Sequence, residues 1–224
     1  MKRAWFVTGT DTGIGKSRVS VALLHTLRRM GHMAVGMKPV AAGAEQGSSG
    51  QWHNDDVIGL RAASDVAVPP ELDNPYLLRQ PVSPHIAAQR EGVTLSVDLL
   101  CERFLQLQEH ADAVVVEGAG GFCVPLTDTL TGADLAVALA QPVILVVGLR
   151  LGCLNHALLT QEAIAARGLR LAGWVANQVD PDLLEPEANL EFLQRRIAAP
   201  LLARWPWQPD AAPHTLSLEL PADA

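Results

Sequence analysis

Short runs of consecutive apolar residues alternate along this chain with longer segments in which apolar residues recur every three or four positions. The short runs are typical of parallel strands covered on both faces, and the longer period is typical of helices. Strands are predicted at residues 4–7, 33–37, 113–116, 143–147 and 171–176. One predicted helix ends at Gly31 and another at Gly92. Two more are predicted to begin near residue 55 and at Ser96, and three to span residues 133–140, 154–166 and 187–197.

Two stretches follow neither pattern. Residues 44–54 are polar and rich in glycine, which predicts a mobile loop. Residues 64–82 contain four prolines and are expected to be mostly irregular, before Ser83 and Pro84 open a helix as N-cap and first helical residue. The sequence shows neither a repeat nor a linker, so we expect one domain, residues 1–224.

The first predicted strand leads into Gly-Thr-Asp-Thr-Gly-Ile-Gly-Lys-Ser at residues 9–17, and a helix follows. Strand, glycine-rich turn and helix are the context of a phosphate-binding loop, in which main-chain N–H groups and the helix N-terminus surround an anion. Lys16 is expected to reach the β- and γ-phosphates, and the Ser17 hydroxyl to bind magnesium. The usual spacing has a glycine at residue 10, whereas here the glycine is Gly9 and Thr10 follows it.

The alternation of strands and helices predicts an α/β fold. We expect a mainly parallel β-sheet flanked by helices on both faces, the three-layer arrangement of P-loop NTPases. Ligands of such sheets bind beyond the carboxyl ends of the strands. Polar or glycine residues follow four more predicted strands at this edge: Lys38, Glu117, Gly148 and Asn177.

The chemistry expected at this edge is phosphoryl transfer. Lys38 and Lys16 are the predicted catalytic residues, because a fixed cation stabilises charge on a transferred phosphoryl group. Glu117 ends a buried strand, where magnesium would account for a carboxylate. The predicted metal ligands are therefore Ser17, Glu117 and Asp56, although adjacent Asp55 fits the pattern equally well and helix capping is the alternative for both aspartates.

Composition narrows the possible partners. The net charge is -7 and the basic residues are scattered, which argues against nucleic acid. No apolar run approaches the length of a membrane span, and the start of the chain lacks the pattern of a signal peptide. Three cysteines without metal-ligand spacing favour buried thiols in a reducing cytoplasm.

Longer stretches are similar to the dethiobiotin synthetases, ATP-dependent enzymes of biotin synthesis. The matching segments are Val-Thr-Gly-Thr-Asp-Thr from residue 7, Gly-Met-Lys-Pro-Val-Ala from 36, Pro-Val-Ser-Pro-His from 81, Val-Glu-Gly-Ala-Gly-Gly from 116, Leu-Gly-Cys-Leu-Asn-His-Ala from 151, Gly-Trp-Val-Ala-Asn from 173 and Pro-Trp from 206. They run along almost the whole chain, except residues 44–52, the region after residue 179 and the C-terminal tail.

The resemblance implies a homodimer that uses ATP, magnesium and carbon dioxide to close the ureido ring on 7,8-diaminopelargonate. One amine takes up carbon dioxide as a carbamate, the carbamate attacks the γ-phosphorus, and the second amine attacks the resulting carbamic–phosphoric anhydride. The diamine lies at the dimer interface in this family, and neither nucleic acid nor a membrane takes part.

The resemblance also assigns residues to the two ligands. The nucleotide-binding residues it implies are Thr12, Gly13, Ile14, Gly15, Lys16, Ser17, Arg18, Asp56, Glu117, Gly118, Ala119, Gly120, Asn177, Gln178, Pro206, Trp207 and Gln208. The residues implied for the diamine are Lys38, Ala42, Ser83, Pro84, Gly152, Cys153, Leu154 and Asn155, the last near a helix start that would serve the partner subunit.

Five positions depart from the family pattern. Ser17 replaces the commoner threonine, with the hydroxyl kept. Gly13 stands where relatives often carry glutamate, and Ala42 replaces a serine that contacts the diamine. Gln178 replaces the usual aspartate after Asn177, which bears on selectivity for the purine base. Asn189 lies near the position of a tyrosine that touches the substrate carboxylate in relatives.

Two other classes of protein share the loop and are the alternatives. A small-molecule kinase would need a lid that carries arginines, and no such segment is evident. A nucleotide-switched ATPase that positions partners usually has an additional lysine early in the loop and a basic amphipathic tail. Here Thr10 and Asp11 occupy the early loop, and the tail from Ala211 is apolar and acidic.

Overall fold

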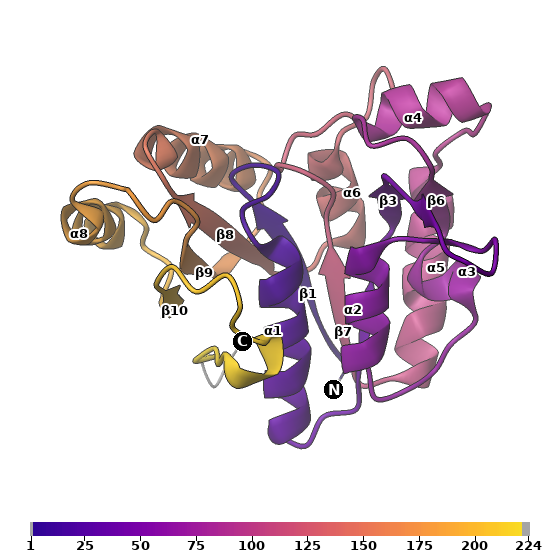
Figure 1. Cartoon of the computed structure of the whole chain (residues 1–224), viewed down its shortest axis with the longest axis horizontal. Coiled ribbons are helices and arrows are strands. Elements are labelled where there is room, and N and C mark those ends of the chain that lie inside the picture. Colours follow the sequence, from indigo (N-terminus) through magenta and orange to yellow (C-terminus); the bar gives the residue numbers. More distant parts are fainter. Residues whose placement is uncertain (1, 221–224) are drawn as a thin grey trace.

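A six-stranded parallel sheet forms the centre of the protein in the computed structural model, which describes residues 2–220 (Figure 1). The strand order is β10-β9-β8-β1-β7-β2. The strands are β1 (Arg3–Gly9), β2 (Ala34–Met37), β7 (Ala113–Glu117), β8 (Val143–Leu149), β9 (Leu171–Gln178) and β10 (Leu201–Trp205). Because all six strands run in one direction, their carboxyl ends lie along one edge of the sheet.

Helices cover both faces of this sheet, which confirms the predicted three-layer α/β fold (Figure 1). Helices α1 (Lys16–Arg29) and α2 (Asp55–Ala63) pack on one face, together with the short helix η1 (Pro213–Thr215). The other face is covered by α5 (Val97–His110), α6 (Gly132–Leu139), α7 (Cys153–Ala166) and α8 (Pro186–Arg196).

The alternation of side chains along the central strand explains why both faces are apolar. Trp5 and Val7 of β1 pack with the α1 side of the core, whereas Ala4 and Phe6 pack with the α5 and α6 side. All four side chains are buried, so β1 is apolar at consecutive positions. This burial fixes the end of β1, and with it the start of the loop at residues 9–17.

The predicted boundaries were short for three neighbouring strands, since β1 also continues from residue 7 to Gly9. Strand β8 continues through Gly148 to Leu149, and β9 continues through Asn177 to Gln178. The two ends extend together because Gly148 pairs with Asn177 and Leu149 with Gln178. Asn177 is therefore a buried residue near the end of a strand, not a loop residue beyond it.

Several short elements were missed in the sequence. Residues 44–54 form an antiparallel pair, β4 (Glu45–Gln46) and β5 (Trp52–His53), so the expectation of a plain loop there was wrong. Strand β3 (Val40–Ala42) pairs in parallel with β6 (Tyr76–Leu78). The other unpredicted elements are β10, the helical turn α3 (Pro70–Asp73) and η1. Strands of two or three residues carry too little periodicity to be recognised from sequence, and the charged Arg204 interrupts the apolar run of β10.

Local signals at helix starts were partly correct. Ser96 caps α5 by accepting a hydrogen bond from the Leu99 amide at 3.2 Å. Ser83 occupies the N-cap position of α4 (Pro84–Glu91), but its hydroxyl makes no capping bond and lies 3.1 Å from Nδ1 of His85.

The expectation of three buried thiols was also wrong. All three cysteines are free, but only Cys153 is buried, Cys101 is half-buried and Cys123 is exposed. Among residues 2–220, no helix is long and apolar enough to cross a membrane.

Candidate active site at the carboxyl edge of the sheet

The loop between β1 and α1 takes its shape from two glycines with positive φ. Gly13 has φ 71° and Gly15, the N-cap of α1, has φ 89°, a region that disfavours residues with a Cβ atom. A Cβ atom at Gly15 would also lie 2.3 Å from Nδ2 of Asn177. The loop is therefore in close contact with the end of β9, and only glycine fits at residue 15.

The side chain of Ile14 explains the unusual placement of glycine at residue 9. Ile14 is buried against Gly9 and Gly148, where an added Cβ atom would lie 2.5 Å from its Cδ1 and Cγ2 atoms respectively. Its carbonyl oxygen accepts a hydrogen bond from Nδ2 of Asn177 at 2.8 Å. Packing and this hydrogen bond together fix the centre of the loop against β1, β8 and β9.

Lys38 forms the electrostatic centre of the site. Its Nζ atom lies 2.5 Å from Oε1 of Glu117 and 2.7 Å from Oδ2 of Asp56. The Ser17 hydroxyl lies 2.5 Å from Oδ1 of Asp56 and 2.8 Å from Oε1 of Glu117, close enough to hydrogen-bond with either carboxylate. Four residues, one directly after β2 and the others in β7, α1 and α2, thus meet within one hydrogen-bonded cluster.

Burial makes these charges strongly interdependent. Burial by itself would lower the pKa of Lys38, but the carboxylates of Glu117 and Asp56 outweigh it and raise that pKa above its ordinary value. Burial would likewise raise the pKa of Asp56, yet the Lys38 ammonium lowers it below its ordinary value. Both groups are therefore charged at neutral pH.

The pKa of Lys16 is shifted in the direction opposite to that of Lys38. Burial, and then repulsion from the Lys38 ammonium, lower the pKa of Lys16 from 10.5 to about 8. The Lys16 ammonium donates a hydrogen bond to the main-chain oxygen of Asp11 at 2.9 Å. A buried lysine with one neutral acceptor is well suited to take an anionic ligand as its partner.

A cleft of about 760 Å³ opens over this cluster. It brings together many of the residues that the sequence assigned to the nucleotide and the diamine: Thr12, Gly13, Gly15, Lys16, Ser17, Arg18, Lys38, Ala42, Asp56, Ser83, Pro84, Glu117, Ala119 and Gly120. The apolar side chains of Val40, Val82 and Val124 also line it and were not predicted. The cleft therefore has one polar, phosphate-loop side and one partly apolar side.

The structure separates the two candidate aspartates. Asp56 reaches both Ser17 and Lys38, whereas Asp55 is exposed in the first turn of α2. Asn54 caps this helix by accepting a hydrogen bond from the Asp56 amide at 3.1 Å. The cap thereby fixes the backbone of Asp56, the aspartate that contacts Ser17 and Lys38.

The remaining sequence-assigned residues lie outside the cleft lining. Ile14 and Gly118 are buried beneath it, and Gln178 donates a hydrogen bond to the Asp180 main chain. Asn177 is buried, and its Oδ1 atom has no hydrogen-bond partner among the described residues. Two groups of these residues lie on the surface. One follows β10 and consists of Pro206, Trp207 and Gln208. The other lies at the start of α7 and consists of Gly152, Cys153, Leu154 and Asn155, of which only Cys153 is buried.

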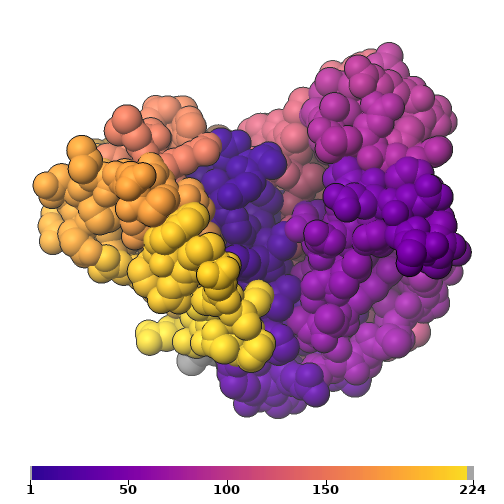
Figure 2. All heavy atoms as spheres, viewed as in Figure 1, coloured from indigo at the N-terminus to yellow at the C-terminus, as the bar shows by residue number. Residues whose placement is uncertain are grey.

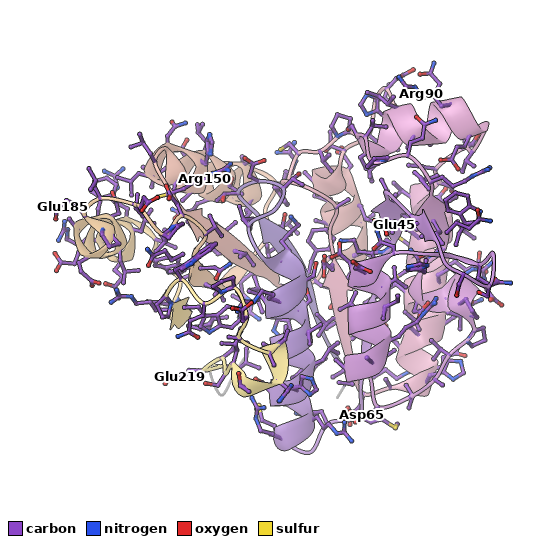
Figure 3. The ribbon with its side chains drawn as sticks, in the orientation of Figure 1. Glu45, Asp65, Arg90, Arg150, Glu185 and Glu219 are labelled. Carbon is purple, nitrogen blue, oxygen red and sulfur yellow. The ribbon has the colours of Figure 1, made fainter. Side chains whose placement is uncertain are left out.

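One contact to the loop was missed in the sequence. Arg150 follows β8 at the same edge of the sheet (Figure 3), and its guanidinium forms an ion pair with Asp11 of the loop. Asp11 also accepts a hydrogen bond from the Thr12 amide at 2.7 Å. The position of Arg150, three residues after the predicted strand at residues 143–147, was the signal that could have identified it.

Fold and loop together define the class of protein, a P-loop NTPase. Solved structures with this fold include the septum site-determining protein MinD of Pyrococcus horikoshii, with a TM-score of 0.59 at 18% identity, covering 93% of this chain and 83% of that one. A ParA family ATPase of Chlorobium tepidum has a TM-score of 0.56 at 14% identity, covering 94% and 87%. At such identities the likeness shows the fold alone.

Sequence comparison gives the family. Residues 3–215 match the family model described as AAA domain. The ATP-dependent dethiobiotin synthetase BioD of Aromatoleum aromaticum is 57% identical over 223 residues, 98% of each chain. The enzyme of the same name from Xanthomonas axonopodis pv. citri is 52% identical over 220 residues, 97% of this chain and 98% of that one. The chain belongs to the ATP-dependent dethiobiotin synthetase family, as the resemblance in its motifs indicated.

The packing of Ile14 predicts the effect of Gly148→Ala. The new methyl group would overlap the Ile14 side chain, so the free energy of unfolding should fall by about 1–3 kcal/mol. Urea unfolding of both proteins measures the change. Gly59→Ala is the matched control, because a Cβ atom at Gly59 of α2 makes only an ordinary 3.6 Å contact with Val21. Equal stability of Gly148→Ala and the wild type would contradict this packing.

The pKa of Lys16 predicts how Lys16→Met changes stability with pH. The folded-state pKa is about 8 against 10.5 when unfolded, so the unfolded chain binds more protons between these values. The wild type should therefore gain stability relative to Lys16→Met as pH rises from 8 to 10.5. Urea unfolding of both proteins across this range measures the difference. A difference that stays constant with pH would contradict the lowered pKa.

Proposed function

We propose that this chain is an ATP-dependent dethiobiotin synthetase that acts through residues 1–224 as a single domain. Its substrates are 7,8-diaminopelargonate and carbon dioxide, and its products are dethiobiotin, ADP and phosphate. The observation that carries the mechanism is the Lys38 ammonium, held 2.5 Å from Glu117 and 2.7 Å from Asp56 beside the phosphate loop. The rest of the proposal assigns each step to residues around this group.

The phosphate loop binds the triphosphate of ATP. Main-chain N–H groups of the loop and the start of α1 surround the phosphates, and the Lys16 ammonium supplies positive charge. Phosphate would raise the lowered pKa of Lys16, because an anion favours the charged form of a buried amine. Lys38 lines the same cleft and stabilises the negative charge that develops on the transferred group.

The residues near Lys38 fit a magnesium ion. Ser17, Asp56 and Glu117 offer one hydroxyl and two carboxylates, and Oε2 of buried Glu117 has no partner among the described residues. No group of three or more histidine, cysteine, aspartate or glutamate side chains that could hold a metal ion occurs among residues 2–220. One hydroxyl and two carboxylates nevertheless suit magnesium, because this ion takes one or two carboxylates and completes its shell with phosphate oxygens and water. Bound there, the ion would neutralise charge on the β- and γ-phosphates.

The partly apolar side of the cleft binds the diamine. Val40, Ala42, Val82 and Pro84 line it, and they offer contact to the carbon chain between the amines and the distant carboxylate. One amine adds to carbon dioxide and loses a proton, which gives a carbamate. Its oxygen attacks the γ-phosphorus and displaces ADP. The second amine then attacks the carbonyl carbon, releases phosphate and a proton, and closes the ring.

A second copy of the chain completes the diamine site in this proposal. Leu151 and Leu159 are 92% and 56% exposed at the start and middle of α7, with exposed Asn155 between them. Exposed apolar side chains rimmed by polar ones are typical of a subunit interface. Gly152, Cys153, Leu154 and Asn155 of one subunit would then lie near the substrate carboxylate in the cleft of the other.

The nucleoside half of ATP lies toward β9 and β10 in this proposal. Asn177, with its buried and unpartnered Oδ1 atom, offers an acceptor to an amino group of the base. Pro206, Trp207 and Gln208 are exposed in the loop after β10 and would lie beside the base, with Gln178 below. Three free thiols support a reducing compartment, for which we propose the cytoplasm.

Product formation tests the proposal. The protein is incubated with diamine, bicarbonate, magnesium and ATP, and dethiobiotin and phosphate are measured together. Equal amounts of the two products are expected. Release of phosphate without dethiobiotin would instead support a nucleotide-switched ATPase, and a phosphorylated small molecule would support a kinase.

Lys38→Ala should reduce turnover far more than ATP affinity. The variant loses the cation that faces the transferred phosphoryl group but keeps the loop that binds ATP. We expect kcat to fall about 100-fold or more, with the Kd for ATP changed far less. Steady-state kinetics and calorimetric ATP binding measure the two quantities. Lys2→Ala, at an exposed lysine outside the site, is the control. Unchanged turnover in Lys38→Ala would remove Lys38 from the mechanism.

A further inference from the structure

Arg18 connects the start of α1 to the C-terminal segment. It follows Ser17 directly, and its Nη2 atom donates hydrogen bonds to the main-chain oxygens of Gln208 at 2.9 Å and Ala211 at 3.3 Å. Arg18 thus joins parts of the chain that lie 190 residues apart. Its Nε atom is buried without a partner among the described residues.

The rest of the C-terminal segment also packs along α1. Leu216 and Leu218 are buried in the part of the core that α1 covers. The ring of His214 lies edge-on to that of His25, with 6.1 Å between their centroids. Figures 1 and 2 show the C-terminal segment, in yellow, lying against α1, in indigo. The Glu219 amide donates a hydrogen bond to the Leu202 oxygen at 2.8 Å, which ties the segment to β10 as well.

The direction of the nucleotide follows from the strand order. Lys38 and Glu117 follow or end β2 and β7, which lie on one side of β1, whereas β8, β9 and β10 lie on the other. A triphosphate in the loop with its terminal group at Lys38 would therefore direct its nucleoside toward β9 and β10. The loop held by Arg18 is the exposed surface beside that path, and it includes Trp207, which is 44% exposed.

We propose that Arg18 is a positioning residue for the nucleoside half of ATP. It acts by holding two carbonyl groups of the loop at residues 206–211, so that this loop forms a wall beside the base and ribose. Both hydrogen bonds come from the one Nη2 atom, which the planar guanidinium holds in a fixed direction, whereas the ammonium of lysine rotates freely on a flexible stem. The inference rests on the proposed ATP site, but it is independent of which acceptor receives the phosphoryl group.

Two ligands separate positioning from direct contact with phosphate. ATP and inorganic tripolyphosphate, each with magnesium, are titrated calorimetrically into wild type, Arg18→Met and Arg18→Lys. Arg18→Met should weaken ATP binding about 10-fold, or about 1.4 kcal/mol, and leave tripolyphosphate binding within about 2-fold. Arg18→Lys should fall between, because one donor can still reach one carbonyl. In the dethiobiotin assay the loss should fall on KM for ATP rather than on kcat.

Arg195→Met, at an exposed arginine on α8, is the matched control. An equal loss of ATP and tripolyphosphate binding in Arg18→Met would mean direct contact of Arg18 with the phosphates and would overturn the proposal. Unchanged ATP binding in both Arg18 variants would overturn it as well. Wild-type protein that binds ATP but makes no dethiobiotin would contradict the proposed function while leaving this test intact. If Arg18→Met does not fold, Arg18→Lys alone decides, since full ATP affinity in that variant would contradict the need for a planar guanidinium at this position.

Discussion

One buried ammonium group sets the charge of the whole site. Lys38 Nζ lies between Glu117, which has no exposed surface, and Asp56, while Ser17 hydrogen-bonds with the same two carboxylates. Removing one partner from a buried ion pair costs about 3–5 kcal/mol, because a charge is left uncompensated in a poorly solvated place. The cluster thus holds β2, β7, α1 and α2 in one geometry. Burial lowers the pKa of Lys16 to about 8, and the Lys38 ammonium adds to this effect while the carboxylates of Glu117 and Asp56 oppose it.

Helix α1 connects this cluster to the C-terminal segment. The hydroxyl of Ser17 lies within hydrogen-bond distance of the Asp56 and Glu117 carboxylates, and the next residue, Arg18, donates hydrogen bonds to the main chain of Gln208 and Ala211. The loop before the helix is fixed by Ile14, which packs between Gly9 and Gly148. In the proposed ATP complex, this one helix would position the groups at both ends of the nucleotide, which would reduce the entropy lost on binding.

Much of the fold and of the cleft could be predicted because the signals were long or chemically specific. Buried strands and periodic helices placed Lys38 and Glu117 at one edge of the sheet, and the structure brings them to 2.5 Å. The strands β4 and β5 were missed because they have two residues each, and β10 because the charged Arg204 interrupts its apolar run. The exposure of Cys123 was missed because composition does not say which way a side chain points. Sequence could place Arg150 near the loop, but its ion pair with Asp11 and the hydrogen bond of Arg18 to Gln208 join residues far apart in sequence, so these contacts are known only from the folded chain.

In the proposed mechanism a carbamate oxygen attacks the γ-phosphorus beside Lys38, and oxygen traced from carbon dioxide reveals whether it does. The reaction is started with carbon dioxide labelled with oxygen-18, before exchange with water, and the released phosphate is analysed by mass spectrometry. One labelled oxygen is expected in each phosphate, since the oxygen that joins carbon to phosphorus leaves with phosphorus when the ring closes. Phosphate that carries oxygen from water instead would rule out attack by the carbamate.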